Sequence, residues 1–154
     1  MKNVLESRYQ MIFENSLAAL LELDFSPLSA LANQVRNRRV DDVRQFITKH
    51  PGLVRKALAG IRVLSSNQAA FDLYGVRGVR ALQSCLIKTF TSAALDLFVE
   101  QFVDLLRGER AFSGEFKHRS SHKGIQDIFL SISVPETYTK SFSRVVVTLQ
   151  DITS

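Results

Sequence analysis

The sequence FSRVVVTLQDITS, residues 142–154, contains the most strongly β-forming run of the chain. Three consecutive valines begin this run, and β-branched residues of this kind favour a buried strand. Val145, Val147 and Leu149 alternate along it and therefore share one face. Asp151, Ile152 and Thr153 follow at once, and the chain then stops. We interpret residues 1–154 as a single domain, and as a fragment of a longer protein that continues after this strand.

Two further strands are predicted immediately upstream. After Gly108 the apolar pattern changes to a period of two in FSGEFKHRSS, residues 112–121, and in IQDIFLSISVPE, residues 125–136. Turn-forming residues separate the runs at His122-Lys123-Gly124 and between Pro135 and Ser141. The period-two pattern and the turns of the C-terminal third therefore predict a three-strand antiparallel meander.

The N-terminal two thirds are predicted to be mostly helical, with two strands. Residues 5–15 have helical spacing, and LAALLELDF, residues 17–25, indicates a first strand. Ser26 and Pro27 indicate the cap and first turn of a helical insert over residues 26–60. A second strand is expected near residues 61–65, and Asn67 is expected to cap a short helix that Gly75 ends. Two longer helices follow in VRALQSCLIKTF, residues 79–90, and SAALDLFVEQFVDLLRGE, residues 92–109.

This order of elements indicates an α+β fold with an antiparallel sheet of about five strands and helices on one face. It resembles the PAS sensory domain in four stretches: YQMIFENSLAALLELDFS, IRVLSSNQAAFDLYG, GEFKHRSSHKG and FSRVVVTLQDITS. The resemblance covers nearly the whole chain. The insert departs from the usual pattern and resembles a subgroup found ahead of bacterial signalling enzymes.

The resemblance implies a sensory input module of a bacterial signalling protein of the two-component or cyclic-dinucleotide type. Such a module senses a small ligand or mediates dimerisation. It passes the signal through Asp151, Ile152 and Thr153 to a C-terminal effector, which is a histidine kinase or a cyclic-dinucleotide enzyme. No catalytic activity is then expected in the chain itself. Cys85, the single cysteine, is compatible with a reducing cytoplasm, and no apolar stretch is long enough to predict a membrane span.

The resemblance also implies a ligand cavity between the sheet and the helices. Counting back from Pro135 by similarity to the family places Phe129, Ser131 and Ser133 inside this cavity, although amphipathicity alone would turn the aliphatic face, which includes Ile128 and Leu130, inward. The other expected lining residues are Val145, Val147 and Leu149 from the last strand and Phe71, Phe90, Phe98 and Phe102 from the helices. The alternative is that the serines bond neighbouring carbonyls and that side chains fill the cavity, because phenylalanine at helical spacing is also typical of a plain core.

No cofactor is identified by the sequence. The surroundings of Cys85, LQSCLIKTF, do not resemble the asparagine-cysteine-arginine signature of the flavin-binding branch of the family, so a buried inert thiol is expected. Haem ligation by His50 is disfavoured because the following proline places it at a helix end. His118 and His122 flank a turn and are interpreted as surface histidines rather than as a metal pair.

A homodimer is the expected assembly. Leu5, Tyr9 and Ile12 form a narrow apolar stripe that suits the outer face of the sheet or a second copy. The net charge of +5 and the arginine-rich insert leave nucleic-acid binding as an alternative, although a solvated helical face is the favoured explanation of the insert. A small α+β enzyme that transfers protons in the cavity is another alternative, with Glu22 and Asp24 as its candidate carboxylates.

Overall fold

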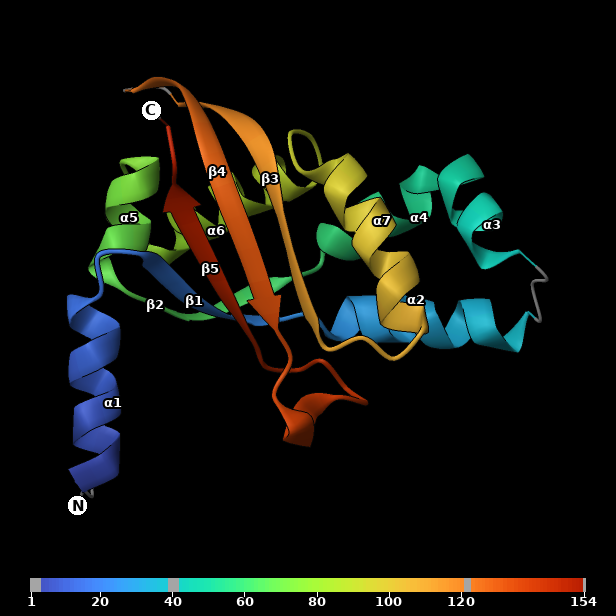
Figure 1. Ribbon diagram of the computed structural model, residues 1–154, viewed down its shortest axis with the longest axis horizontal. Helices are drawn as coiled ribbons and strands as arrows, with labels where there is room; N and C mark the ends of the chain where they lie inside the picture. The colour runs from blue at the N-terminus through green and yellow to red at the C-terminus, as the bar shows by residue number, and fades with distance from the viewer. Residues whose placement is uncertain (1–3, 39–41, 121–122, 154) are drawn as a thin grey trace.

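The computed structural model describes residues 4–38, 42–120 and 123–153. Helices and strands follow the order expected from the sequence, and the fold is α+β (Figure 1). The elements are α1 Val4–Asn15, β1 Ala19–Asp24, α2 Ser26–Asn37, α3 Val43–Lys49, α4 Pro51–Leu58, β2 Arg62–Ser66, α5 Gln68–Tyr74, α6 Val79–Phe90, α7 Leu95–Leu106, β3 Ala111–Ser120, β4 Gly124–Ser133, the 3₁₀ turn η1 Glu136–Tyr138 and β5 Val145–Asp151.

The five strands form one antiparallel sheet in the order β2-β1-β5-β4-β3. The last strand therefore lies in the middle of the sheet. On one side Val147 pairs with Leu21 of β1, and on the other side Leu149 pairs with Leu130 of β4. Both edges of β5 are hydrogen-bonded, and Val145, Val147 and Leu149 on its inner face are buried.

The inner face of β4 is aliphatic, so one sequence-based expectation is wrong. Leu130 and Ile132 are buried opposite Leu149 and Val147, whereas Phe129 and Ser131 are half-buried and Ser133 is exposed on the other face. The predicted inward orientation of Phe129, Ser131 and Ser133 assumed that the first helix covers the outer face. Without that cover, the face that gains most from leaving water turns to the helices, at about 0.8 kcal/mol per buried methylene.

Helix α1 does not lie along the outer face of the sheet. It projects from the edge near β1 and α5, and its N-terminal end points away from the domain (Figure 1). Phe13, near its last turn, is buried, whereas Met11 and Ile12 are 61% and 67% exposed. The helix is therefore attached at its C-terminal end and is open to solvent along the rest of its described surface.

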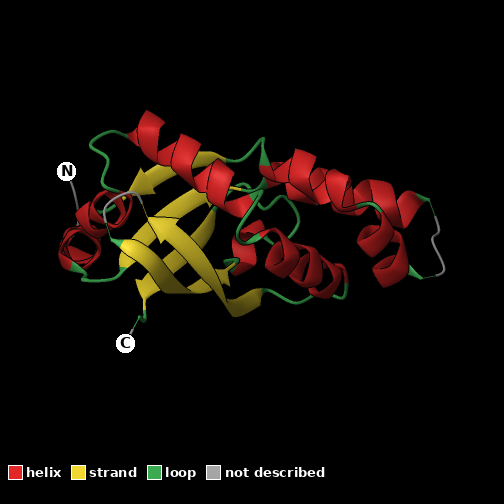
Figure 2. Ribbon diagram, turned by 90° about the horizontal axis from the view of Figure 1, so that it is seen from above, coloured by secondary structure: helices red, strands yellow, loops and turns green. Residues whose placement is uncertain are grey.

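Three helices, α2, α3 and α4, separate β1 from β2 and extend beyond the sheet on one side (Figure 2). Helix α2 packs on α4, and α3 and α4 pack on α7. Ser26 does not cap α2 as expected, since no side chain caps this helix. Instead, the carboxylate of Asp24 accepts a hydrogen bond from the Ser26 amide at 2.9 Å, a local bond that short acidic side chains often make.

The α5 region follows the sequence-based expectation. The Asn67 side chain accepts a hydrogen bond from the Ala70 amide, and Gly75 ends the helix with φ +65°. Glycine adopts this left-handed conformation without steric cost. In the part of the chain that the structure describes, no single helix is long and apolar enough to cross a membrane, and α6 and α7 meet that criterion only as a pair bent by 82°.

Candidate functional site

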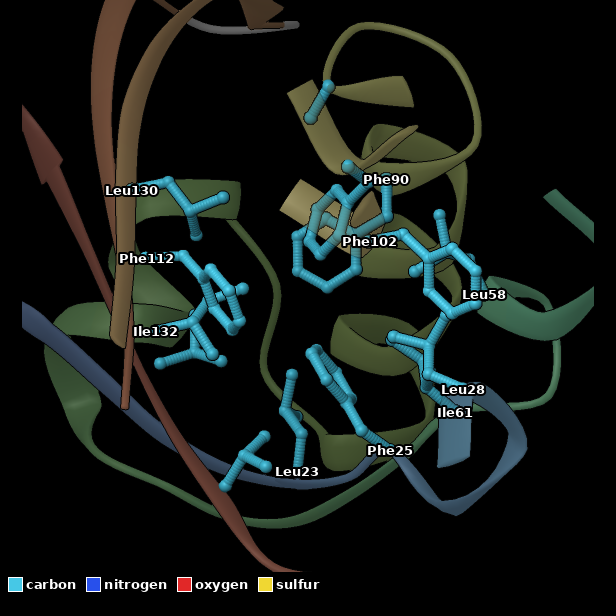
Figure 3. Packing of buried hydrophobic residues seen from close by; sticks show 14 of the residues in the cluster. Leu23, Phe25, Leu28, Leu58, Ile61, Phe90, Phe102, Phe112, Leu130 and Ile132 are labelled. Carbon is cyan, nitrogen blue, oxygen red and sulfur yellow. The ribbon is translucent and has the colours of Figure 1, made fainter. Parts of the chain in front are cut away.

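The space between the sheet and the helices is occupied by side chains. The rings of Phe90 and Phe98 have centroids 4.7 Å apart, and Phe25 meets both rings edge-on. Phe102 and Phe112 close the same region from α7 and β3, as Figure 3 shows. Of the lining expected from the sequence, Phe90, Phe98, Phe102, Val145, Val147 and Leu149 lie in this core, and Phe71 is half-buried at its margin.

A small cavity remains next to these rings. It measures about 20 Å³ and lies between Phe98 and Phe102 of α7, Phe112 of β3 and Phe142 of the loop before β5. This volume is close to the minimum that holds one water molecule. In this conformation the cavity fits the alternative of a core filled by side chains.

Gln101 of α7 lines that cavity and was not anticipated from the sequence. The residue is buried, with an exposed fraction of 7%. Within the described residues, neither its amide nitrogen nor its amide oxygen has a hydrogen-bond partner. A buried amide without partners costs about 1–3 kcal/mol. Gln101 is therefore a buried polar group next to the cavity whose hydrogen-bonding capacity is unused among the described residues. Periodicity alone marks α7 as apolar and does not identify it.

The end of β5 is fastened to β4 by the residues expected to carry the output. Thr153 donates from its amide and from its hydroxyl to one oxygen of the Asp151 carboxylate, and Gln126 donates to the other at 2.7 Å. The Thr153 hydroxyl oxygen also accepts a hydrogen bond from the Asp127 amide at 2.8 Å. These bonds hold the pKa of Asp151 below its ordinary value, and the two from Thr153 contribute most to this shift.

Asn67 joins α1, β1 and α5 through one fully buried side chain. Its amide nitrogen donates to the carbonyls of Phe13 and Ala18, both at 3.0 Å, and its oxygen accepts from the amides of Leu20 and Ala70. The sequence identifies Asn67 as a helix cap. Its bonds to Phe13, Ala18 and Leu20 depend on the tertiary structure.

Cys85 and His118 lie together, away from the interior cavity. Cys85 of α6 is half-buried rather than fully buried, and both residues line an open pocket between α6 and the end of β3. His122 falls outside the described residues. His50 is exposed, its ring stacks on Phe46, and its Nδ1 lies 2.8 Å from the Phe46 carbonyl oxygen. Among the described residues, no three histidine, cysteine or acidic side chains form a potential metal site.

The two carboxylates considered for proton transfer do not lie in the interior. Glu22 is half-buried on the outer face of β1, where it accepts a hydrogen bond from the Ser65 hydroxyl at 2.8 Å and pairs with Arg144 at 3.5 Å. Asp24, on the same face, is held by its bond to the Ser26 amide. Neither residue can act as the buried proton-transfer group of that alternative.

The basic residues of the insert are exposed. Arg44 pairs with Glu100 of α7, and Arg38 lies over the ring of Phe46. Lys49, Arg55 and Lys56 are open to solvent. Arg39 lies outside the described residues. These positions fit a solvated face, and nucleic-acid binding stays an untested alternative.

Of the apolar stripe expected to form a dimer, the structure describes only the side chain of Ile12. Ile12 is exposed next to Met11, and Leu17, in the segment after α1, is fully exposed. The side chains of Leu5 and Tyr9 lie outside the described residues. Three large apolar side chains therefore stand in solvent at or just after α1.

No protein-family model and no curated protein matches the sequence. Solved structures do match the fold. A PAS domain from Colwellia psychrerythraea superposes with a TM-score of 0.56 at 11% identity, covering 98% of each chain. A domain of a sensory box sensor histidine kinase/response regulator from Geobacter sulfurreducens gives a TM-score of 0.53 at 10% identity, covering 96% of this chain and 94% of that chain. A LOV protein from Rhodobacter sphaeroides gives 0.54 at 10% identity, covering 99% of this chain and 69% of that chain.

Proposed function

Given that the chain has the fold of PAS domains, we propose that it is the sensory input module of a bacterial signalling protein, of the two-component or cyclic-dinucleotide type. The module acts in the cytoplasm and has no catalytic activity of its own. It passes a signal to a C-terminal effector domain, a histidine kinase or a cyclic-dinucleotide enzyme.

The observation that supports this proposal best is the placement of β5. A central strand hydrogen-bonded on both edges moves with the sheet, and the bonds of Asp151 and Thr153 extend that connection to the last described residue. A shift of β4 or β1 would therefore reach any segment that follows. An edge strand with a loose end could not transmit such a shift.

The test of output uses the full-length protein and measures effector activity. Asp151→Ala and Thr153→Val each remove bonds between the end of β5 and β4, so both should change basal activity or its response. Gln150→Ala is the matched control, because this exposed side chain has no such bond and lies one position earlier. Unchanged effector activity in both folded variants would contradict the proposed output path.

Gln101 supports a ligand-sensing role for the interior. A small molecule with one polar group would satisfy its amide and fill the adjacent cavity, at the cost of displacing phenylalanine rings. Native mass spectrometry of the purified module, with an absorbance scan, should reveal a retained molecule that Gln101→Leu loses. A wild-type mass equal to that of the chain alone, with no visible or near-ultraviolet band beyond that of tyrosine, would count against this role.

The exposed apolar side chains at and just after α1 support a homodimer. Burial of Met11, Ile12 and Leu17 against a second copy would remove them from water. Light scattering should show a dimer at high concentration, and Ile12→Glu should shift it to monomer, whereas Glu14→Gln, on the same helix, should not. A wild-type monomer at all concentrations would contradict the dimer.

A further inference from the structure

A second pocket lies outside the interior cavity and shares none of its lining residues. It has a volume of about 420 Å³ and opens between the end of α5, the C-terminal half of α6 and the end of β3. Pockets that hold small organic ligands measure about 300–1,000 Å³. The size of this pocket therefore suits a ligand, whereas the interior cavity has room for about one water.

The floor of the pocket is aromatic and preformed. The Tyr74 hydroxyl donates to Thr89 Oγ1 at 3.2 Å, and the Thr89 hydroxyl donates to the Cys85 carbonyl at 2.9 Å. The ring of His118 meets the Tyr74 ring edge-on, with centroids 5.5 Å apart. Burial raises the pKa of Tyr74 to about 12, and the phenol is uncharged at neutral pH.

Lys88 of α6 gives the pocket a positive charge, and His118 of β3 also lines it. No described lining residue carries a carboxylate. Arg119 is among the lining residues, but it is exposed and alternates to the outer face of β3, so the positive charge of the pocket comes from Lys88. Lys88 and Arg119 form no ion pair with any acidic side chain of the described residues. Ammonium and guanidinium groups bind carboxylate and phosphate oxygens through charge-assisted hydrogen bonds, which are about twice as strong as neutral ones.

We propose that this pocket binds a small organic anion, in which a flat apolar body rests on the Tyr74 and His118 rings and a carboxylate or phosphate meets Lys88. The proposal stands apart from the signalling role, since binding is measured on the 154-residue chain without an effector.

The test compares three probes of similar shape by isothermal titration calorimetry: benzoate, phenyl phosphate and the neutral benzyl alcohol. At least one anion should bind saturably, and at least tenfold more tightly than benzyl alcohol. The anion that binds more tightly shows whether the pocket prefers a carboxylate or a phosphate. Equal binding of all three probes, or no saturable binding of either anion below about 10 mM, would overturn the proposal.

Two variants localise the binding. Lys88→Gln should weaken binding of the better anion at least fivefold and leave binding of benzyl alcohol unchanged. Lys56→Gln, at another exposed lysine, on α4, should have no effect. Ala93→Phe places a ring at a lining position and should abolish binding of all probes. Melting curves establish that the variants are folded. Undiminished anion binding in Lys88→Gln or Ala93→Phe would place the site elsewhere and refute the assignment.

Discussion

Asn67 has no exposed surface, and its side chain bonds to four different backbone groups. Two of these groups belong to the chain around the end of α1, one to β1 and one to α5. A buried polar side chain stabilises a fold only when its hydrogen bonds are made, and here every donor and acceptor position of the amide is used. This residue therefore attaches the lead-in helix to the sheet.

We expect Asn67→Ala to lower the free energy of unfolding by about 2–4 kcal/mol, because several buried backbone groups lose their partner. Urea denaturation followed by circular dichroism measures the loss. Asn33→Ala, at an exposed position of α2, is the control and should change stability by less than about 0.5 kcal/mol. A similarly small effect in Asn67→Ala would show that the four hydrogen bonds of this side chain do not stabilise the fold.

Tyr74 should make the free energy of unfolding depend on pH. Burial raises its pKa to about 12, whereas an unfolded tyrosine titrates near pH ~10. Between these values the unfolded chain loses the phenolic proton and the folded chain keeps it, so the folded state becomes less stable as the pH rises. The loss is on the order of 2 kcal/mol by pH 12 and is absent below pH ~9.

The urea midpoint at pH 9 and pH 11.5 measures this loss. Tyr74→Phe has no phenol to titrate at this position, so it should lose less stability over the interval than the wild type does. Tyr138→Phe retains Tyr74 and should behave like the wild type. An equal loss in all three proteins would show that Tyr74 does not titrate abnormally.

At the scale of elements, α7 approaches β3 at Gly114. A Cβ atom at this position would overlap Cδ1 of Leu97. The glycine thus allows α7 to press its side chains onto the sheet. Because the clashing atom is the end of a flexible side chain, alanine should be tolerated at a small cost and a branched side chain should not.

We expect Gly114→Val to reduce the free energy of unfolding by about 1–3 kcal/mol through overpacking. Ser113→Val, on the exposed outer face of the same strand, should be nearly neutral or stabilising. Adding Leu97→Ala should restore part of the loss in Gly114→Val, and a double-mutant cycle gives the coupling. Additive effects of the two substitutions would exclude the contact as the cause.

At the scale of the whole molecule, the insert and the sheet share one hydrophobic core. Leu28, Leu31 and Val35 of α2 and Val54 and Leu58 of α4 belong to the same buried cluster as the strands. Helix α4 also packs on α7, and Leu58 lies on the helical side of that cluster in Figure 3. The insert should therefore unfold together with the sheet rather than as a separate unit.

Leu58→Ala tests this coupling. We expect a loss of about 2–5 kcal/mol, as for other buried leucines, and a single transition that has the same midpoint by far-ultraviolet circular dichroism and by tyrosine fluorescence. Leu64→Ala is the control, since Leu64 of β2 is 46% exposed. Two separate transitions in Leu58→Ala would show that the insert is an independent unit.

The sequence alone determined the kind and order of the elements, because a period of two or 3.6 residues, a cap such as Asn67 and a breaker such as Gly75 act over a few neighbouring residues. It also indicated the family fold and the alternation within β5. The tertiary structure decided which face of β4 turns inward, because that depends on which face the helices cover. It decided likewise that Gln101 is buried with no hydrogen-bond partner among the described residues, and that Lys88 and His118 line one pocket. These facts follow from contacts between segments far apart in the chain, and such contacts cannot be inferred from a pattern of neighbouring residues.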